Sequence, residues 1–366
     1  MFITNNKPAI WASYMAAKTK EDGMRSRACA IAARTAAAAA ICIISVALAC
    51  GAAQAQTTPY VMKITTPTIH AAPDLYARNL AAAVEKDSGG RIKAQVYPAS
   101  QLGSIPRQIE GTQFGSIQCA VIPPEFFVGV DQRFEVLAAP GLVRTVAQGQ
   151  RLAADPAVLK TMLALGADKG LLGAGLFFAE PAEVVSKTPI RHLSDFKGKK
   201  LRIFASEFQS EAFKRLGATP VAMSPADVLP AIQQGALDGA AFGVQLLSGL
   251  HFYDSAKYVA TTSHSAIFII VELSKKWHDS LPKDLQEIVD RDAAKEATAI
   301  NPQALDILNG ARKTWTDHGG ELIALPADEQ TKMLQMLTSV GDDVAAKKPL
   351  VKTAYETVKE AAQRLK

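Results

Sequence analysis

The clearest secondary-structure pattern of this 366-residue chain lies in residues 193–239, LSDFKGKKLRIFASEFQSEAFKRLGATPVAMSPADVLPAIQQGALDG. Within it, an apolar strand at 199–205 leads into a helix that opens at Ser206, with Gln209 at capping-box spacing. A second strand, a second helix and a third strand at 237–243 follow in order. This β-α-β-α-β rhythm predicts an α/β fold built on a parallel, doubly wound sheet.

The same rhythm occurs in the first third of the chain. Alternating apolar residues predict strands at 60–70 and 91–98, with a helix at 73–90 between them and a further helix and strand after them. Two such units predict two α/β lobes. A helical composition extends over about 35 residues within 280–320, about 50 Å at 1.5 Å per residue. A helix of that length outruns one small lobe, so we expect it to bridge both.

Residues 1–55 have the features of a secretory signal peptide. Basic residues precede the apolar run TAAAAAICIISVALA, which ends in AQA, so cleavage is expected before Gln56 and Met24 is an alternative start. A lipoprotein signal at Cys50 is a weaker alternative, because ALAC lacks the usual Leu. The segment holds six of the 40 basic and two of the 35 acidic residues, which leaves 34 and 33. The signal peptide predicts an exported protein, and the near-neutral balance argues against a nucleic-acid partner.

The usual catalytic and metal-binding motifs do not occur in the sequence. The six histidines do not fall at metal-ligand spacing, and Cys119 is the one cysteine after the signal segment. There is no phosphate-binding lysine loop, and GVQLLSG has no serine at its centre. We therefore predict no catalytic residues, no metal, no cofactor and no enzymatic activity. An exported hydrolase or isomerase, with a triad assembled from distant residues, remains the alternative.

Arg202 stands between apolar neighbours in the strand at 199–205. It is either a solvated or ion-paired residue on the strand face, or a charge placed for a ligand. Two features favour a ligand. Ligands of open α/β sheets bind at the carboxyl ends of strands, and this strand ends where a helix begins. The guanidinium fork also matches a carboxylate with two parallel hydrogen bonds.

Several motifs in order resemble those of TRAP-transporter solute-binding proteins of the DctP type. Residues 193–239 are similar to that family's D-L-K-G-x-K-[IL]-R, G-A-x-P-x-x-M and E-V-Y-x-A-L-Q-x-G-x-[VL]-D-G. SGGRIKAQVYPASQLGS, 88–104, is similar to another of its motifs, and the likeness covers 60–340. The resemblance implies periplasmic capture of a small organic acid for delivery to TRAP membrane subunits. A clamshell that serves a sensor or another transporter class remains an alternative.

The resemblance also implies a fold, a two-lobed periplasmic binding protein clamshell with a long inter-lobe helix. Its strands cross between the lobes, so neither lobe is one continuous segment. We expect the first lobe at 57–179 plus about 267–308. The second lobe is expected at 180–266 plus about 309–366, including the C-terminal helices.

The resemblance places the family's carboxylate-binding arginine on Arg202. Sugar-acid binders have an Asn where this chain has Phe242, a second arginine where it has Ala182, and a glutamate where it has Pro123. One charge among several phenylalanines predicts a monocarboxylate with an apolar or aromatic body. Core packing is the alternative for each phenylalanine, and Glu125 faces either a ligand hydroxyl or water. The predicted ligand-binding residues are Arg202, Phe204, Phe242, Thr66, Pro123, Glu125, Phe126 and Phe178.

Overall fold

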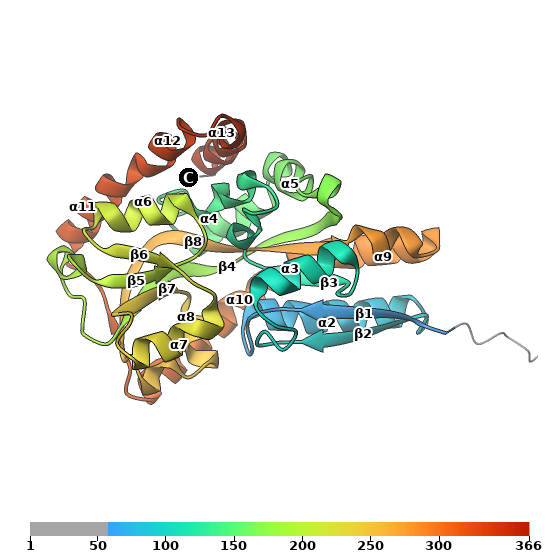
Figure 1. Cartoon of the computed structure of the whole chain (residues 1–366), viewed down its shortest axis with the longest axis horizontal. Helices are drawn as coiled ribbons and strands as arrows, with labels where there is room; N and C mark the ends of the chain where they lie inside the picture. The colour runs from blue at the N-terminus through green and yellow to red at the C-terminus, as the bar shows by residue number, and fades with distance from the viewer. Residues whose placement is uncertain (1–57, 366) are drawn as a thin grey trace, which may run out of the picture. The chain divides into compact units, whose positions relative to one another are not determined.

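The computed structural model describes residues 58–365, and the predicted signal peptide at 1–55 lies outside them. Within that range, nine strands form one mixed sheet in the order β2-β1-β3-β8-β4-β7-β5-β6, with β9 beside β8 (Figure 1). The strands are β1 (Tyr60–Thr65), β2 (Ile92–Tyr97), β3 (Cys119–Ile122), β4 (Leu171–Ser186), β5 (Lys200–Ile203), β6 (Thr219–Ala222), β7 (Gly239–Phe242), β8 (Tyr258–Ser274) and β9 (Glu321–Ile323).

Helices connect these strands and cover the sheet. The α-helices are α2 (Ala72–Asp87), α3 (Ile105–Phe114), α4 (Val146–Ala153), α5 (Pro156–Leu163), α6 (Glu207–Arg215), α7 (Pro225–Gln233), α8 (Val244–Gly249), α9 (Lys275–Ser280), α10 (Lys283–Asp317), α11 (Ala327–Thr338), α12 (Val340–Ala345) and α13 (Pro349–Arg364). The short 3₁₀ helices are η1 (Pro124–Phe127), η2 (Gln132–Ala138), η3 (Ala167–Lys169), η4 (Leu193–Phe196) and η5 (Phe252–Asp254). None of the helices in this part of the chain is both long and apolar enough to cross a bilayer.

The sheet consists of two parallel groups joined by an antiparallel pair. Strands β1, β2 and β3 form the first half, and β5, β6 and β7 form the second half; the pairing is parallel within each. Strands β4 and β8 run antiparallel between the halves, β8 also pairing with β3 and β4 with β7. The predicted parallel arrangement therefore holds within each half. The stretch AEVVSK at 182–187 overlaps the end of the 16-residue β4.

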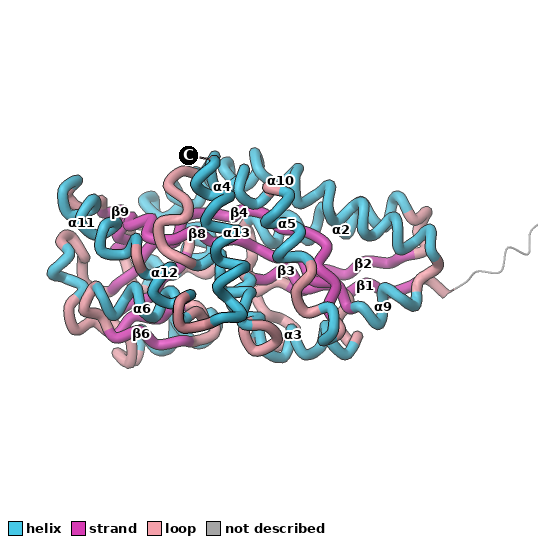
Figure 2. The backbone as a smooth tube through the Cα atoms, turned by 90° about the horizontal axis from the view of Figure 1, so that it is seen from above, coloured by secondary structure: helices cyan, strands magenta, loops and turns pink. Residues whose placement is uncertain are grey.

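The strands and one helix cross between the halves, as the resemblance implies. The expected crossing points, 179/180 and 266/267, lie opposite each other in the sheet, where Glu180 pairs with Ile267. The 35-residue α10 packs against α2 in the first half and α8 in the second, and Figure 2 shows it beside α2 on one side of the sheet. The boundaries of the two lobes stay a prediction, since they depend on which parts move together.

The apolar core forms one layer on each face of the sheet. Successive side chains of a strand point to opposite faces, so Phe177 and Phe178 belong to different layers. One layer contains α2, α8 and α10, and the other contains α4, α6 and α13. Both faces of the central strands are thereby buried, which explains why β4 and β8 read as almost continuous apolar runs.

The helix that follows β5 begins where predicted, but its predicted capping box does not form. The side chain of Ser206 makes no cap hydrogen bond, and Oε1 of Gln209 instead accepts from the backbone N–H of Phe204 at 3.0 Å. A distant carboxylate caps the helix. Glu135 of η2 accepts from the N–H of Glu207 at 2.7 Å and from the Ser206 hydroxyl at 3.3 Å. A contact with Glu135, which is distant in sequence, therefore takes the place of the predicted local capping box.

Candidate functional site

Arg202 lies in the middle of the second half, on β5, with Val221 and Ala240 as its neighbours on β6 and β7. Its side chain is fully buried. Nε donates to the carbonyl of Met223 at 2.8 Å, and Nη1 donates to the carbonyl of Ala241 at 2.9 Å. These two carbonyls lie at the carboxyl ends of β6 and β7. The guanidinium is therefore held at the edge of the sheet where α/β proteins bind ligands.

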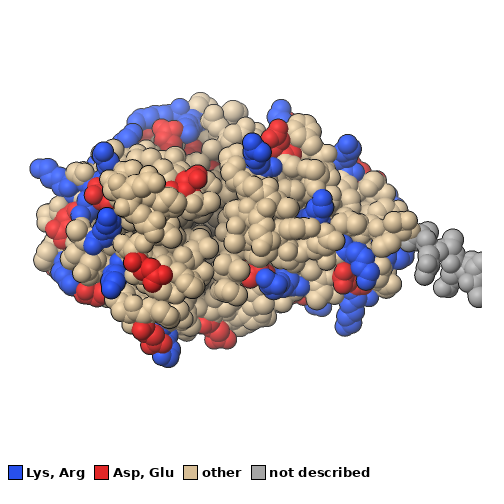
Figure 3. Space-filling view, turned by 60° about the horizontal axis from the view of Figure 1, so that its bottom comes forward, with Lys and Arg blue, Asp and Glu red and all other residues tan. Residues whose placement is uncertain are grey.

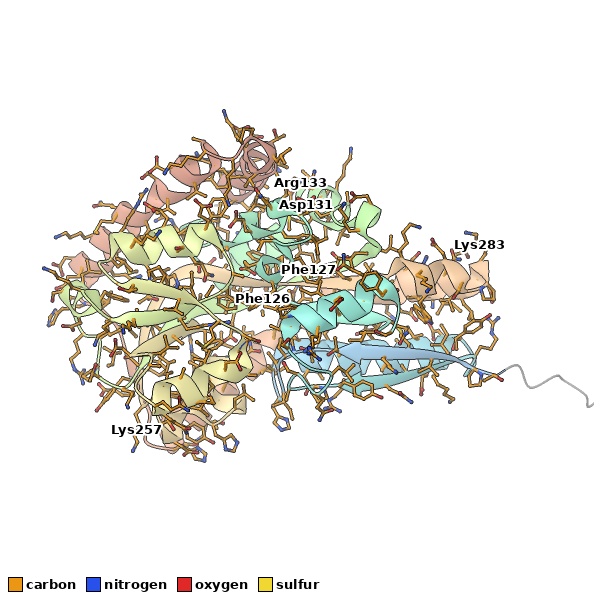
Figure 4. All side chains as sticks on the ribbon, in the orientation of Figure 1. Phe126, Phe127, Asp131, Arg133, Lys257 and Lys283 are labelled. Carbon is orange, nitrogen blue, oxygen red and sulfur yellow. The ribbon has the colours of Figure 1, made fainter. Side chains whose placement is uncertain are left out.

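Three phenylalanine rings surround this guanidinium. Its Cζ lies 4.1 Å from the ring centre of Phe242, 4.5 Å from that of Phe204 and 5.9 Å from that of Phe126. Phe126 comes from η1, and Figure 4 shows it in the middle of the molecule, between the two halves. Its ring meets that of Phe204 edge-on at 5.8 Å. The faces of aromatic rings attract a cation, which offsets part of the cost of burying the charge.

A small apolar cavity adjoins these rings. Its volume is about 30 Å³, far below the roughly 300–1,000 Å³ of a typical ligand pocket. The cavity is lined by Pro67, Thr68, Ala71, Pro73, Pro123, Phe126, Ala179, Glu180, Phe204, Pro225, Phe242, Gly243, Leu246, Ile267 and Ile269. The structure is thus closed at this point, and a ligand needs the two halves to separate before it can enter.

The structure brings most of the predicted site residues together. Pro123, Phe126, Phe204 and Phe242 line the cavity, whereas Arg202 lies behind the rings and does not line it itself. Their role in ligand binding stays a prediction.

Two predicted residues lie elsewhere. The hydroxyl of Thr66 is 3.2 Å from that of Thr68, and only Thr68 reaches the cavity wall. The ring of Phe178 points to the opposite face of the sheet, where its centre lies 5.7 Å from that of Phe268. We therefore do not retain Phe178 in the proposed site.

The charge of Arg202 is not neutralised by a nearby acid. Among residues 58–365, no carboxylate lies within 4.0 Å of its nitrogens, and Nη2 has no hydrogen-bond partner. Burial lowers the pKa of Arg202 to about 9. Burial raises the pKa of the neighbouring Glu125 to about 8, although the field of Arg202 opposes this shift. At neutral pH the surroundings of the cavity therefore carry a positive charge, which suits an anion.

Glu180 is a cavity residue that the sequence did not predict. Its Oε2 accepts from the backbone N–H of Gln245 at 3.0 Å, at the start of α8. Burial raises its pKa to about 8. A Cβ on Gly243 would lie 2.0 Å from the Glu180 carboxyl carbon, so this approach requires glycine. In the sequence, Glu180 is an acid within an apolar strand, as Arg202 is a base within an apolar strand.

Larger pockets lie elsewhere in the described part, and one of them, of about 220 Å³, is lined by Arg144, Thr145, Ser263 and Ser265. An open groove of about 500 Å³ beside α8 and α10 is lined by His70, His251 and His318 but by no Lys or Arg. Within the described residues no cluster of three or more His, Cys, Asp or Glu is placed to hold a metal ion. On the face in Figure 3, Lys and Arg are interspersed with Asp and Glu, without a patch of one sign.

His264 is buried and lies among side chains of the core. Its Nδ1 is 2.7 Å from the hydroxyl of Thr262, and its ring packs edge-on against Phe213 at 5.1 Å. Burial lowers the pKa of His264 to about 4, so the imidazole is neutral at physiological pH.

The fold is a two-lobed clamshell, as in solved periplasmic solute-binding proteins. Residues 71–348 match the DctP model, described as bacterial extracellular solute-binding protein, family 7. The chain belongs to this family, whose members bind and carry solutes, and its TRAP-type resemblance is confirmed.

Known proteins similar to this chain include one relative and two solved structures. YiiZ of Salmonella typhimurium, described as uncharacterized, is 32% identical over 208 residues, which are 57% of this chain and 64% of YiiZ. A TRAP periplasmic solute-binding protein from Desulfovibrio salexigens with bound orotic acid has a TM-score of 0.77 at 21% identity, over 84% of this chain and 100% of that one. The sugar-acid-binding protein DctPAm from Advenella mimigardefordensis in complex with galactonate has a TM-score of 0.79 at 21% identity, over 84% and 99%.

Proposed function

We propose that this chain is the periplasmic solute-binding subunit of a TRAP transporter and that Arg202 binds the carboxylate of its ligand. The observation that carries the proposal is that the guanidinium of Arg202 is buried among three phenylalanine rings and has no acidic partner among the described residues. Removing a charge from water costs several kcal/mol unless it is compensated. Two carbonyls and three rings compensate part of that cost, and Nη2 remains available for an anion.

The hydrogen bonds of Arg202 restrict how a carboxylate can approach. Nε has a single N–H, and Met223 accepts it, so the side-on Nε and Nη2 edge is not available. Nη1 and Nη2 each have two N–H groups. The carbonyl of Ala241 accepts one N–H of Nη1. A bidentate carboxylate therefore binds end-on, to Nη1 and Nη2. Opening of the lobes would withdraw Phe126 from the guanidinium, because Phe126 belongs to the first half.

The wall of the cavity favours an apolar or aromatic body on the ligand. Thr68 and Glu180 supply its polar side chains, and Glu180 is already engaged by the start of α8. A sugar acid would leave several hydroxyls without partners, at about 1–3 kcal/mol for each buried group. The two solved relatives hold orotic acid and galactonate, so the ligand class proposed for this chain depends on its own wall residues.

A thermal-shift screen of organic acids tests the ligand class. Aromatic and branched apolar monocarboxylates should raise the melting temperature more than sugar acids do. Stabilisation by galactonate or uronic acids alone would refute the proposed class while leaving the solute-binding role in place.

Titration calorimetry with the tightest acid from the screen tests the role of Arg202. Arg202→Met should bind at least tenfold more weakly, since truncating a buried charged partner costs roughly 2–5 kcal/mol. The control is Arg191→Met, which removes an exposed arginine paired with Glu321 and should not change the affinity. Circular dichroism establishes that both variants are folded. Near-native affinity of folded Arg202→Met would refute the assignment.

Delivery to TRAP membrane subunits, rather than to a sensor or another transporter class, is the part of the proposal that gene neighbourhood tests. Adjacent genes for the small and large membrane subunits support it, and an adjacent sensor kinase gene would favour the alternative. An exported hydrolase or isomerase would turn over the bound acid, and recovery of the ligand unchanged after long incubation argues against it.

A further inference from the structure

Glu125 is the second buried polar group near the guanidinium, and it comes from the other half of the molecule. It precedes Phe126 on η1, its residue is 1% exposed, and Oε2 has no hydrogen-bond partner within residues 58–365. Arg202 acts on it through its charge, yet the two do not form an ion pair within 4.0 Å in the described chain. Two buried polar atoms without partners in the described chain, Glu125 Oε2 and Arg202 Nη2, thus come from the two different halves.

The charged groups that act on Glu125 come from two neighbouring elements. Arg202 on β5 favours the ionised carboxylate, whereas Glu135 on η2 disfavours it. Glu135 is itself paired with Lys348 at 2.7 Å, which weakens its effect. The helix α3 and the strand β8 also pack against η1, but no charged group from either acts on Glu125 in the described chain. Burial outweighs the attraction of Arg202, so the pKa of Glu125 rises to about 8.

An ionised and a protonated Glu125 would have opposite effects on an incoming carboxylate. An ionised Glu125 would already balance Arg202, and the ligand would then bring an excess negative charge into a dry site. A protonated Glu125 leaves the positive charge to the ligand and offers an O–H donor as well. Hydrogen bonds from O–H to a carboxylate are among the short, strong ones, and two carboxyl groups at one site readily share a proton.

We propose, on the basis of the function proposed above, that Glu125 binds the ligand in its protonated form and donates its O–H to the carboxylate held by Arg202. The site then takes up one anion and keeps one proton, and the net charge of Arg202, Glu125 and the ligand carboxylate is zero. Above the pH at which free Glu125 ionises, binding must draw a proton from solvent. The affinity then falls by about tenfold for each further pH unit.

Titration calorimetry between pH 7 and 9, with benzoate and orotate as probes, tests this coupling. Because the pKa of Glu125 is about 8, its ionisation alone should weaken the wild-type affinity about tenfold across this range. Glu125→Gln keeps a donor but has no proton to lose. Whatever the affinity of this variant at pH 7, it should change by less than about threefold between pH 7 and 9. The titration of Arg202 accounts for that residual change.

The matched control is Glu180→Gln, which removes a buried acid of the cavity wall whose pKa is also about 8. Because Glu180 already accepts from Gln245, its variant should retain the tenfold dependence. Loss of the pH dependence in Glu180→Gln, or its persistence in Glu125→Gln, overturns the proposal.

A measurement without ligand decides the protonation state independently. The infrared difference between the purified wild type and Glu125→Gln at pH 7 should contain the C=O band of a protonated carboxyl group. Absence of that band overturns the inference, whichever acid the protein binds. Failure of Arg202→Met to weaken binding would instead overturn the proposed function, so the two failures are distinguishable.

Discussion

Glu135 and Glu207 contact the same lysine, and we predict that they differ severalfold in their contribution to stability. Glu135 is 2% exposed and lies 2.7 Å from Lys348 Nζ, whereas Glu207 is 48% exposed and lies 2.6 Å from it. Loss of a helix cap costs about 1 kcal/mol, and loss of a charged hydrogen bond about 1.5–3 kcal/mol. Glu135→Ala loses both, so its free energy of unfolding should fall by about 2–4 kcal/mol. Glu207→Ala loses an exposed ion pair, worth about 0–1 kcal/mol.

Urea unfolding of the two variants and the wild type, followed by circular dichroism, measures this difference. The slope of the unfolding free energy should be the same in all three proteins, so that the midpoints can be compared directly. Equal losses in the two variants, or a loss below about 1 kcal/mol in Glu135→Ala, would show that burial does not set the strength of these contacts.

Two further predictions concern buried groups near the middle of the sheet. Gly243→Ala should displace the Glu180 carboxyl from the N–H of Gln245 and cost about 1–3 kcal/mol in thermal unfolding. The same substitution should cost less in a Glu180→Ala background, and an equal cost there would point to another cause. The folded-state pKa of His264, about 4, lies below its unfolded value, so stability is lost as pH falls from about 6.5 to 4. His264→Gln should lose about 3 kcal/mol less over that range, and parallel pH profiles would contradict the role of His264.

Local sequence patterns predicted the outer strands of the sheet but not its two long central strands, β4 and β8. The strands at 60–65 and 200–203 alternate or end at clear helix starts, so periodicity finds them. In contrast, β4 and β8 are buried on both faces, and a run such as 267–273 carries no alternation to distinguish a strand from a buried helix. The antiparallel pairing that joins the halves is a long-range contact, which the composition of neither strand encodes.

At the site, the sequence predicted the residue types better than their geometry. Arg202 and its three surrounding phenylalanines come together as expected. The carbonyls that hold the guanidinium belong to Met223 and Ala241, and backbone acceptors leave no mark in a sequence. Phe178 is predicted in the site as one of several phenylalanines, but the pleat of β4 turns its ring to the other face.

The crossing of β8 between the halves also has a consequence for how the chain folds. Strand β3 pairs on one side with β1, but its other neighbour is β8, with Cys119 opposite Leu273. The edge of β3 is therefore covered only by residues that lie more than a hundred positions later in the chain. Such distant pairing slows folding, because the entropy of closing a long loop is lost before the contact forms. Any chain that ends before residue 258 keeps that edge open, and an open edge recruits strands from other molecules.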